Sequence, residues 1–247
     1  MDYKDLLNQS KFFNKNNEEI RLNIGCGPNM FSGNGWINYD REDFNHYIEF
    51  IKQIKDKDDV SKYANNVLRC IDLVKNNKEF IFKIHDLRKG FGQHKDNSIT
   101  AIYIGQVIEH LNPIYETPKL LNECYRILKP GGIIRLATPN LDILIDAYIN
   151  NKMDNFNMDQ PEFYTKTDNG SKLSYIMFGA CGDRCTWDYY EGHMHIYNKI
   201  SMISILQEAG FKDIEFYNDI GLSKDTVMAK DICDAGVSHS LLVEGIK

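Results

Sequence analysis

Short apolar runs alternate with longer amphipathic stretches along most of this chain. Runs of strand length lie at 21–25, 36–40, 80–84, 101–104 and 133–138. Apolar residues recur with helical spacing over about 59–76, which predicts one helix. A second helix is predicted to begin at Thr117-Pro118, with Thr117 as N-cap and Pro118 as first helical residue, and to stop at Gly131-Gly132. This alternation predicts an α/β fold with a doubly wound, mostly parallel sheet.

The last third of the chain adds a helix and two strands. The helix begins at Asn198 and stops at Gly210, and the strands cover 214–217 and 241–244. We therefore expect a single domain over 20–247, preceded by an N-terminal arm over 1–19. Two stretches, about 41–58 and 141–192, exceed what a crossover needs and are expected to be insert segments on the substrate side.

The first apolar run breaks into glycines. Leu22-Asn23-Ile24-Gly25-Cys26-Gly27-Pro28 predicts a strand and a sharp turn in which the backbone can approach a ligand closely. Asp40 ends the second strand, where a carboxylate can accept hydrogen bonds from two ribose hydroxyls. The third glycine of the dinucleotide fingerprint is missing. Asp40 also lies closer in sequence to the glycine turn than in that fingerprint, where the acidic residue comes about 20 residues later. Both departures disfavour NAD.

Two later segments are the most specific signals. The fourth strand is followed by Gln106-Val107-Ile108-Glu109-His110-Leu111, and residues 121–140 read LNECYRILKPGGIIRLATPN. With the glycine turn, they resemble class I S-adenosylmethionine-dependent methyltransferases, strongly over 20–140 and moderately over 193–247. The resemblance implies a Rossmann-like sheet of seven strands ending in an antiparallel pair, with S-adenosyl-L-methionine as the cofactor. It is nearest to small bacterial methyltransferases of the GCGP type, often associated with carbohydrate synthesis.

The resemblance also assigns cofactor-binding residues. The glycine turn and Asp40 would hold the nucleoside, Asp86 would accept from the adenine amino group beside Leu87, and Gln106 would lie at the methionine end. An aspartate in a loop is usually a turn cap, which is the alternative for Asp86. The expected cofactor-binding set is Asn23, Gly25, Cys26, Gly27, Asp40, Asp86, Leu87 and Gln106.

Catalytic candidates lie after the fourth strand and after the second insert. His193 and His195 are the leading candidates for a general base, because a neutral imidazole can accept a proton near pH 7. Glu109 and His110 are expected to border the transfer site, although Glu109 could instead cap backbone N–H groups. The expected acceptor-binding residues are Arg184, Trp187, Tyr197 and Asn140.

A zinc site is the alternative for part of this region. Cys181, Cys185, His193 and His195 could supply four ligands, but the two histidines are closer in sequence than in most structural zinc sites. We therefore expect no metal and read the six cysteines as reduced thiols.

The amino-acid composition favours some classes of binding partner over others. The net charge of −6 over 247 residues offers no broad basic surface, so a small-molecule acceptor is favoured over nucleic acid. The polar start and the absence of a long apolar run predict a cytoplasmic protein without a membrane segment. Two other functions stay open: a non-catalytic cofactor-binding protein of the same fold, and a nucleotide-sugar or NAD-linked enzyme.

Overall fold

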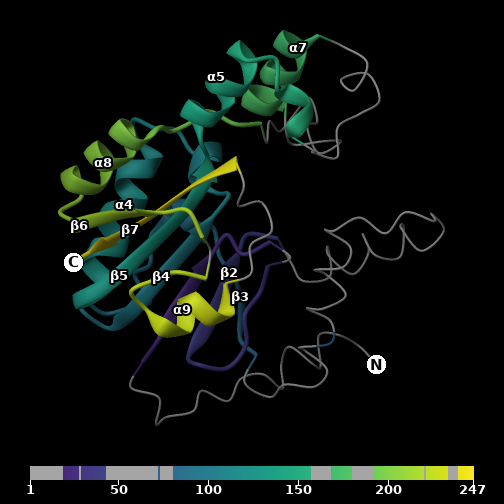
Figure 1. The fold of residues 1–247 in the computed structure, drawn as a ribbon. Helices are drawn as coiled ribbons and strands as arrows, with labels where there is room; N and C mark the ends of the chain where they lie inside the picture. Colours follow the sequence, from purple (N-terminus) through teal and green to yellow (C-terminus); the bar gives the residue numbers. More distant parts are fainter. Residues whose placement is uncertain are drawn as a thin grey trace.

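Seven strands form one sheet (Figure 1). The computed structural model describes residues 19–27, 29–42, 72, 80–156, 168–179, 192–219, 221–232 and 239–247. The strand order is β3-β2-β1-β4-β5-β7-β6; the first five run parallel, and β7 is antiparallel to both neighbours. The predicted sheet and its antiparallel end are confirmed. The strands are β1 (Arg21–Ile24), β2 (Trp36–Asp40), β3 (Phe82–Ile84), β4 (Ile99–Gly105), β5 (Leu128–Pro139), β6 (Lys212–Tyr217) and β7 (Ser240–Ile246).

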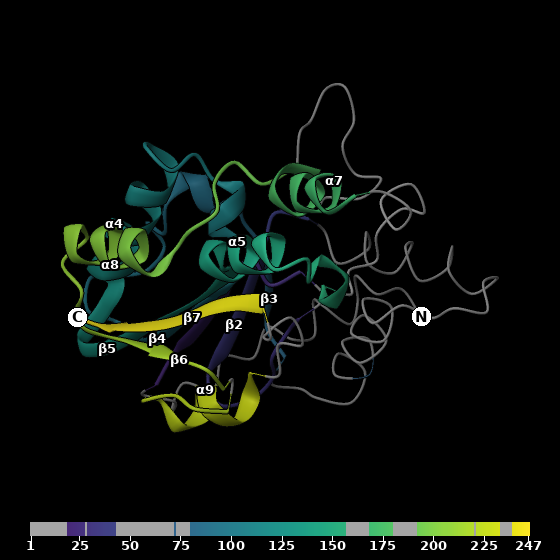
Figure 2. The ribbon, with the colours of Figure 1, turned by 45° about the horizontal axis from the view of Figure 1, so that its top comes forward.

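Helices cover both faces of the sheet (Figure 2). One face carries α4 and α8, and the other carries α9. The described α-helices are α4 (Glu116–Ile127), α5 (Leu141–Ile149), α7 (Asn169–Ser174), α8 (Lys199–Glu208) and α9 (Thr226–Asp231). Short turns are η1 (Leu87–Lys89), η2 (Ile108–His110), η3 (Met153–Asn155) and the π-helical η4 (Tyr175–Gly179). No helix within these described ranges is long and apolar enough to cross a membrane.

The central strand β4 shows why both faces are covered. Ile102 and Ile104 are buried in the core beneath α4 and α8, whereas Ala101 and Tyr103 are buried with α9 residues. Side chains alternate between the two faces of a strand, so the apolar run 101–104 of β4 needs cover on both faces.

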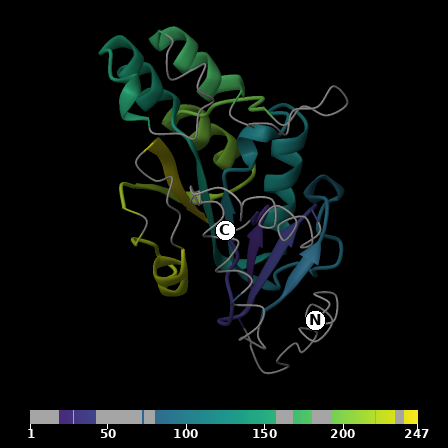
Figure 3. The same ribbon diagram turned by 90° about the vertical axis from the view of Figure 1, so that its right-hand side faces the viewer.

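The described part of the second insert has a small core of its own. Leu144 and Ala147 of α5 pack with Met153, Ile176 and Ile196. Because α5 starts where β5 ends, this core lies beyond the carboxyl end of the parallel strands (Figures 1 and 3). Helix α5 forms the first part of the stretch that the sequence analysis expected to be an insert segment.

Two expectations about α4 were wrong. Thr117 is buried inside the first turn, and Tyr115 occupies the N-cap position without a capping side chain. The helix ends at Ile127, because Leu128 already pairs with Ile99 in the sheet. Gly131 therefore lies within β5 and is not a helix C-cap; its N–H donates to the Lys247 carbonyl over 3.0 Å.

Helix α9 was not predicted from the sequence. Asp225 caps it by accepting from the N–H groups of Val227 and Met228, over 2.8 and 2.9 Å, and also pairs with the Arg21 guanidinium. The helix is too short to show a clear apolar period. The predicted helix over 59–76 lies outside the described residues except at Asp72, which is helical. The arm over 1–19 is described only at Glu19, and the insert over 41–58 only at 41–42.

A buried ion pair joins the last parallel strand to the antiparallel edge. Arg135 of β5 donates to Glu244 of β7 over 2.8 Å, and neither side chain is exposed. The carboxylate also accepts from the Lys224 N–H over 3.0 Å. We predict that Glu244→Ala lowers the free energy of unfolding by about 3–5 kcal/mol, because it leaves a buried guanidinium without its carboxylate. Chemical denaturation measures this loss.

Glu215 provides the matched control. It is the register neighbour of Glu244 on β6, but its side chain is 55% exposed and pairs with Lys224 over 3.3 Å at the surface. Glu215→Ala should cost about 0–1 kcal/mol. Equal losses in the two variants would contradict the role assigned to the buried pair.

Candidate functional site

The strand order reverses between β1 and β4. From β1 the chain builds outward through β2 and β3, then returns to place β4 on the other side of β1. In open α/β sheets, ligands bind outside the carboxyl ends of the strands at such a switch point. The ends of β1, β2, β4 and β5 therefore define the candidate site.

The glycine turn fits this crevice for a steric reason. Gly25 has φ +65°, which favours glycine, and a Cβ added there would lie 2.5 Å from Val107 Cγ2. The backbone leaving β1 thus touches the segment that follows β4. Only a residue without a side chain permits this approach without a shift of Val107.

Asp40 lies directly against the same turn. Its Oδ2 accepts from the Gly27 N–H over 2.7 Å, and its Oδ1 accepts from the Glu42 N–H over 3.1 Å. An ionised carboxylate can accept about four hydrogen bonds, so these two contacts leave room for ligand hydroxyls.

Asn23 and Cys26 connect the glycine turn to β2 through buried hydrogen bonds. Buried Asn23 donates through Nδ2 to the Asn29 carbonyl over 2.7 Å and to Asn38 Oδ1 over 3.0 Å. The N–H of buried Cys26 donates to the Tyr39 carbonyl over 3.0 Å. These contacts tie the loop to β2, so both residues hold the turn in place from within the protein.

Asp86 has the geometry of a cap. Its carboxylate accepts from the Arg88 N–H over 3.1 Å at the start of η1 and pairs with the Arg88 side chain over 2.9 Å. Hydrogen bonding to Arg88 is the main cause that lowers the pKa of Asp86. Leu87 is partly buried beside it in η1. Asp86 therefore caps η1, which is the alternative role given above, and its adenine-binding role stays a prediction.

Gln106 leaves β4 in an unusual conformation. Its φ is +56°, and its Nε2 donates to Ser240 Oγ, the first residue of β7, over 3.0 Å. The side chain therefore lies over the carboxyl end of β5, between β4 and β7.

Glu109, His110 and His193 form a polar cluster at this edge, with potential ligand atoms within 4.8 Å of one another. Glu109 is fully buried and its Oε2 accepts from Thr138 Oγ1 over 3.0 Å. The rings of His110 and His193 meet edge to face at a centroid distance of 4.8 Å. The structure thus brings together three of the four catalytic candidates.

Burial keeps His193 uncharged. Desolvation, reinforced by the nearby His110 and opposed by a hydrogen bond to the Ile176 carbonyl, lowers the pKa of His193 to about 4. The Ile176 carbonyl lies 2.8 Å from Nδ1 and can only accept, so Nδ1 carries the proton. The lone pair is then on Nε2. Burial also lowers the pKa of His195.

His195 points to a different neighbour from His193. Its ring packs edge to face on Tyr197 at 4.5 Å, as expected for residues two apart in an extended segment. The buried Tyr197 hydroxyl donates to Thr117 Oγ1 over 3.2 Å, so it is directed at α4. Asn140 caps α5 by accepting from the Asp142 N–H over 3.0 Å. Arg184, Trp187, Cys181 and Cys185 lie outside the described residues.

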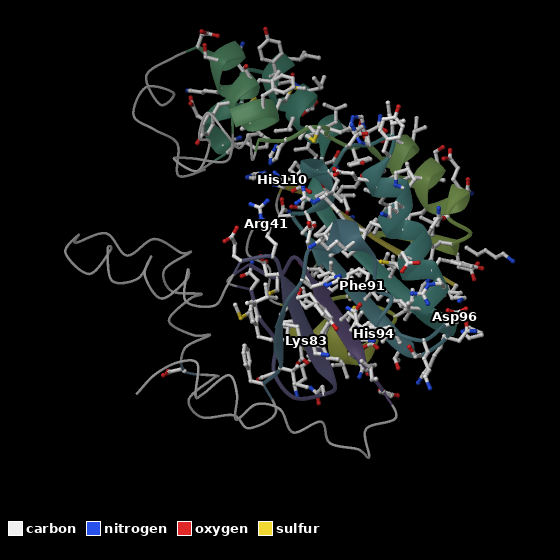
Figure 4. The ribbon with its side chains drawn as sticks, turned by 180° about the vertical axis from the view of Figure 1, so that it is seen from behind. Arg41, Lys83, Phe91, His94, Asp96 and His110 are labelled. Atoms are coloured by element: carbon white, nitrogen blue, oxygen red, sulfur yellow. The ribbon has the colours of Figure 1, made fainter. Side chains whose placement is uncertain are left out.

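Three residues at the site were not singled out from the sequence. Thr138 orients Glu109, Val107 packs on Gly25, and Arg41 follows Asp40 at the end of β2. Thr138 and Arg41 carried a usable signal, because polar residues at the ends of parallel strands meet at one edge. Figure 4 shows Arg41 and His110 near the same end of the sheet, well apart from His94.

The seven-strand order, the switch-point glycine turn and the acidic end of β2 define the class I methyltransferase fold. Residues 57–136 match the family described as "Methyltransferase domain". This match covers about a third of the chain, and the seven-stranded sheet with its antiparallel end is the one that the sequence predicted for this fold.

One curated relative and several solved structures are similar. A Mycolicibacterium smegmatis protein described as a probable S-adenosylmethionine-dependent methyltransferase is 40% identical over 45 residues, 18% of this chain and 16% of that relative. A methyltransferase structure from Archaeoglobus fulgidus is 15% identical, with 94% of this chain and 87% of that chain covered and a TM-score of 0.45. One from Mesorhizobium loti is 13% identical, with 99% and 97% covered and a TM-score of 0.45. At these scores the fold assignment rests on this chain's own strand order.

The glycine turn yields a paired stability prediction. Gly25→Ala should destabilise the protein by more than the about 1–2 kcal/mol that a left-handed residue costs, because its Cβ also meets Val107. Gly27→Ala is the control: its φ is +49°, but nothing lies within 4 Å of the added Cβ.

The double variant Gly25→Ala/Val107→Ala separates strain from contact. Removing the Val107 methyl groups should return part of the excess loss, measured by thermal unfolding. If Gly25→Ala and Gly27→Ala are equally stable, the close approach does not constrain the turn.

Proposed function

We propose that this chain transfers a methyl group from S-adenosyl-L-methionine to a small-molecule acceptor. One observation carries the proposal: the glycine turn contacts both the Asp40 carboxylate and Val107 at the switch point between β1 and β4. This crevice offers an acidic hydrogen-bond acceptor and close backbone approach to a nucleoside. It lies next to the polar cluster that follows β4.

The arrangement supports a division of the site into two halves. The turn and Asp40 would bind the nucleoside, and Gln106 and the segment after it would lie along the methionine end. Beyond that end, the insert core of α5 and η4 stands over the edge that holds His193. An acceptor bound there would face the methyl group from the insert side.

The chemistry asks little of the protein beyond alignment and proton removal. The cofactor's sulfonium makes the methyl group reactive, so the site must orient the acceptor and exclude water. Neutral His193 or His195 could accept a proton if the acceptor is a hydroxyl or an ammonium group. The O- or N-methylation of such a group is the reaction proposed.

The acceptor is proposed to be a phosphorylated or carbohydrate-related metabolite. Support comes from Arg41, which follows Asp40 and lies near His110 in Figure 4, and from Arg184 in the sequence of the second insert. A guanidinium is suited to bidentate binding of phosphate or carboxylate. The test is S-adenosylhomocysteine formation with a panel of phosphorylated amines, sugar phosphates and nucleotide sugars, alongside unphosphorylated counterparts. Tight cofactor binding without turnover on any of them would favour the non-catalytic alternative.

Asp40→Ala should weaken S-adenosylmethionine binding by about 100-fold or more. A charge-assisted hydrogen bond contributes about 1.5–3 kcal/mol, and the nucleoside would lose two. Isothermal titration calorimetry measures the change. Asp96→Ala, which removes an exposed carboxylate paired with Arg126, is the matched control and should bind normally. Equal affinity of Asp40→Ala and wild type would remove Asp40 from the site.

His193→Ala and His195→Ala should separate chemistry from cofactor binding. Both should retain S-adenosylmethionine affinity by calorimetry, and at least one should lose about 100-fold or more in turnover on the acceptor found in the panel, as expected for loss of a general base. Full turnover in both variants would show that neither histidine assists the transfer.

A further inference from the structure

The cluster of Glu109, His110 and His193 has the composition of a metal site. One carboxylate and two imidazoles form a known ligand set for zinc and for other divalent first-row metals. The three residues come from two distant parts of the chain, η2 and the segment that follows the second insert. Their ligand atoms lie within 4.8 Å of one another.

The surrounding contacts orient the ligands. Thr138 donates to Oε2 of Glu109, and the Ile176 carbonyl fixes the proton of His193 on Nδ1, which leaves the Nε2 lone pair for an ion. Metal-binding histidines usually donate their second ring N–H to a carbonyl or carboxylate in this way. Partners that select the correct tautomer are expected around a metal ligand.

The backbone holds the two parts of the cluster together. The Glu109 carbonyl accepts from the N–H groups of Met194 and His195 over 2.7 and 3.2 Å. His193 is thereby fixed beside η2, whether or not an ion is bound. A site held by such main-chain contacts does not have to assemble from separate segments.

The spacing is compatible with binding after a small contraction. Ligand atoms about 2.0–2.2 Å from one ion lie about 3.3–3.6 Å apart in a tetrahedral site. The ligand atoms lie up to 4.8 Å apart, so the longest separation must shorten by roughly 1.2–1.5 Å, and each side chain moves by less than that. His110 is only partly buried, so its ring can make much of this movement.

We propose that Glu109, His110 and His193 bind a divalent transition-metal ion, with Zn²⁺ as the leading candidate. The positive ion would offset the burial of the Glu109 carboxylate. Three protein ligands leave at least one position open, as in catalytic zinc sites. The zinc set considered from the sequence shares only His193 with this site.

The ion's function rests on the proposed methyl transfer. Coordination lowers the pKa of a bound hydroxyl, so an acceptor alcohol would lose its proton and remain bound as an alkoxide. With Nε2 of His193 on the ion, that proton would pass to His195 or to water. The alkoxide oxygen would form the bond to the methyl carbon as the carbon–sulfur bond breaks. S-Adenosylhomocysteine would leave with the electron pair of that bond. Metal binding itself needs neither cofactor nor acceptor, so it can be tested separately.

The test is direct metal titration of the full chain after chelation and dialysis. Zn²⁺ binding is measured by calorimetry, and Co²⁺ serves as a probe whose visible absorption reports its coordination. Wild type should bind one ion. Glu109→Gln, His110→Gln and His193→Gln should each weaken binding by at least about 100-fold, and Thr138→Val by about 10–100-fold as an outer partner.

His94→Gln is the matched control. His94 is partly buried and bonds to the Tyr39 hydroxyl over 2.9 Å, far from His110 in Figure 4, so its replacement should leave metal affinity unchanged. Because His110 is not in the core, His110→Gln should fold, which thermal unfolding without metal checks. Zn²⁺ should raise the melting temperature of wild type and not of His110→Gln.

Two results would overturn the metal site. One is wild-type metal affinity in Glu109→Gln, His110→Gln and His193→Gln. The other is loss of binding in Cys181→Ser or Cys185→Ser while Glu109→Gln binds normally, which would assign the ion to the alternative set. Calorimetry with S-adenosylmethionine is run in parallel: if the cofactor does not bind but Zn²⁺ does, the proposed function fails and the metal site stands.

Discussion

The contact between the backbone of Gly25 and the side chain of Val107 is the constraint on which the site depends. β1 pairs in parallel with both β2 and β4, so Leu22 stands in register with Ile37 on one side and Ile102 on the other. The chain must therefore turn away from β1 in the narrow space beside the exit of β4. That requirement brings Asp40 against the turn, at the switch point of the sheet.

Glu109 is a second residue at which separate segments of the chain meet. Its side chain accepts from Thr138 at the end of β5, and its carbonyl accepts from the backbone that returns from the insert. One residue thus joins the exits of two central strands to the segment carrying His193 and His195. The cofactor half and the acceptor half of the proposed site are linked through this buried carboxylate, which gives it a structural role whether or not it binds an ion.

The observed ends of the strands and helices show where local sequence signals predict structure and where tertiary contacts override them. β2 matches its predicted bounds because its apolar run ends at a charged residue, Asp40. Helix α4 ends before the Gly131-Gly132 signal because Leu128 is already paired in the sheet, and pairing outweighs a local stop signal. Short α9 is stabilised by contacts from distant residues, including the Arg21–Asp225 pair, and therefore has little local signature.

The sequence by itself determined which segments form strands and their succession along the chain, the glycine turn and the acidic residue that faces it. Each depends on residues within one element or on its ends, where periodicity and backbone freedom act locally. Only the tertiary structure decided that His193 meets Glu109 and His110. That choice depends on how the insert packs into its own core and on two main-chain hydrogen bonds to Glu109. No local pattern encodes such contacts, because they form between segments far apart in the chain.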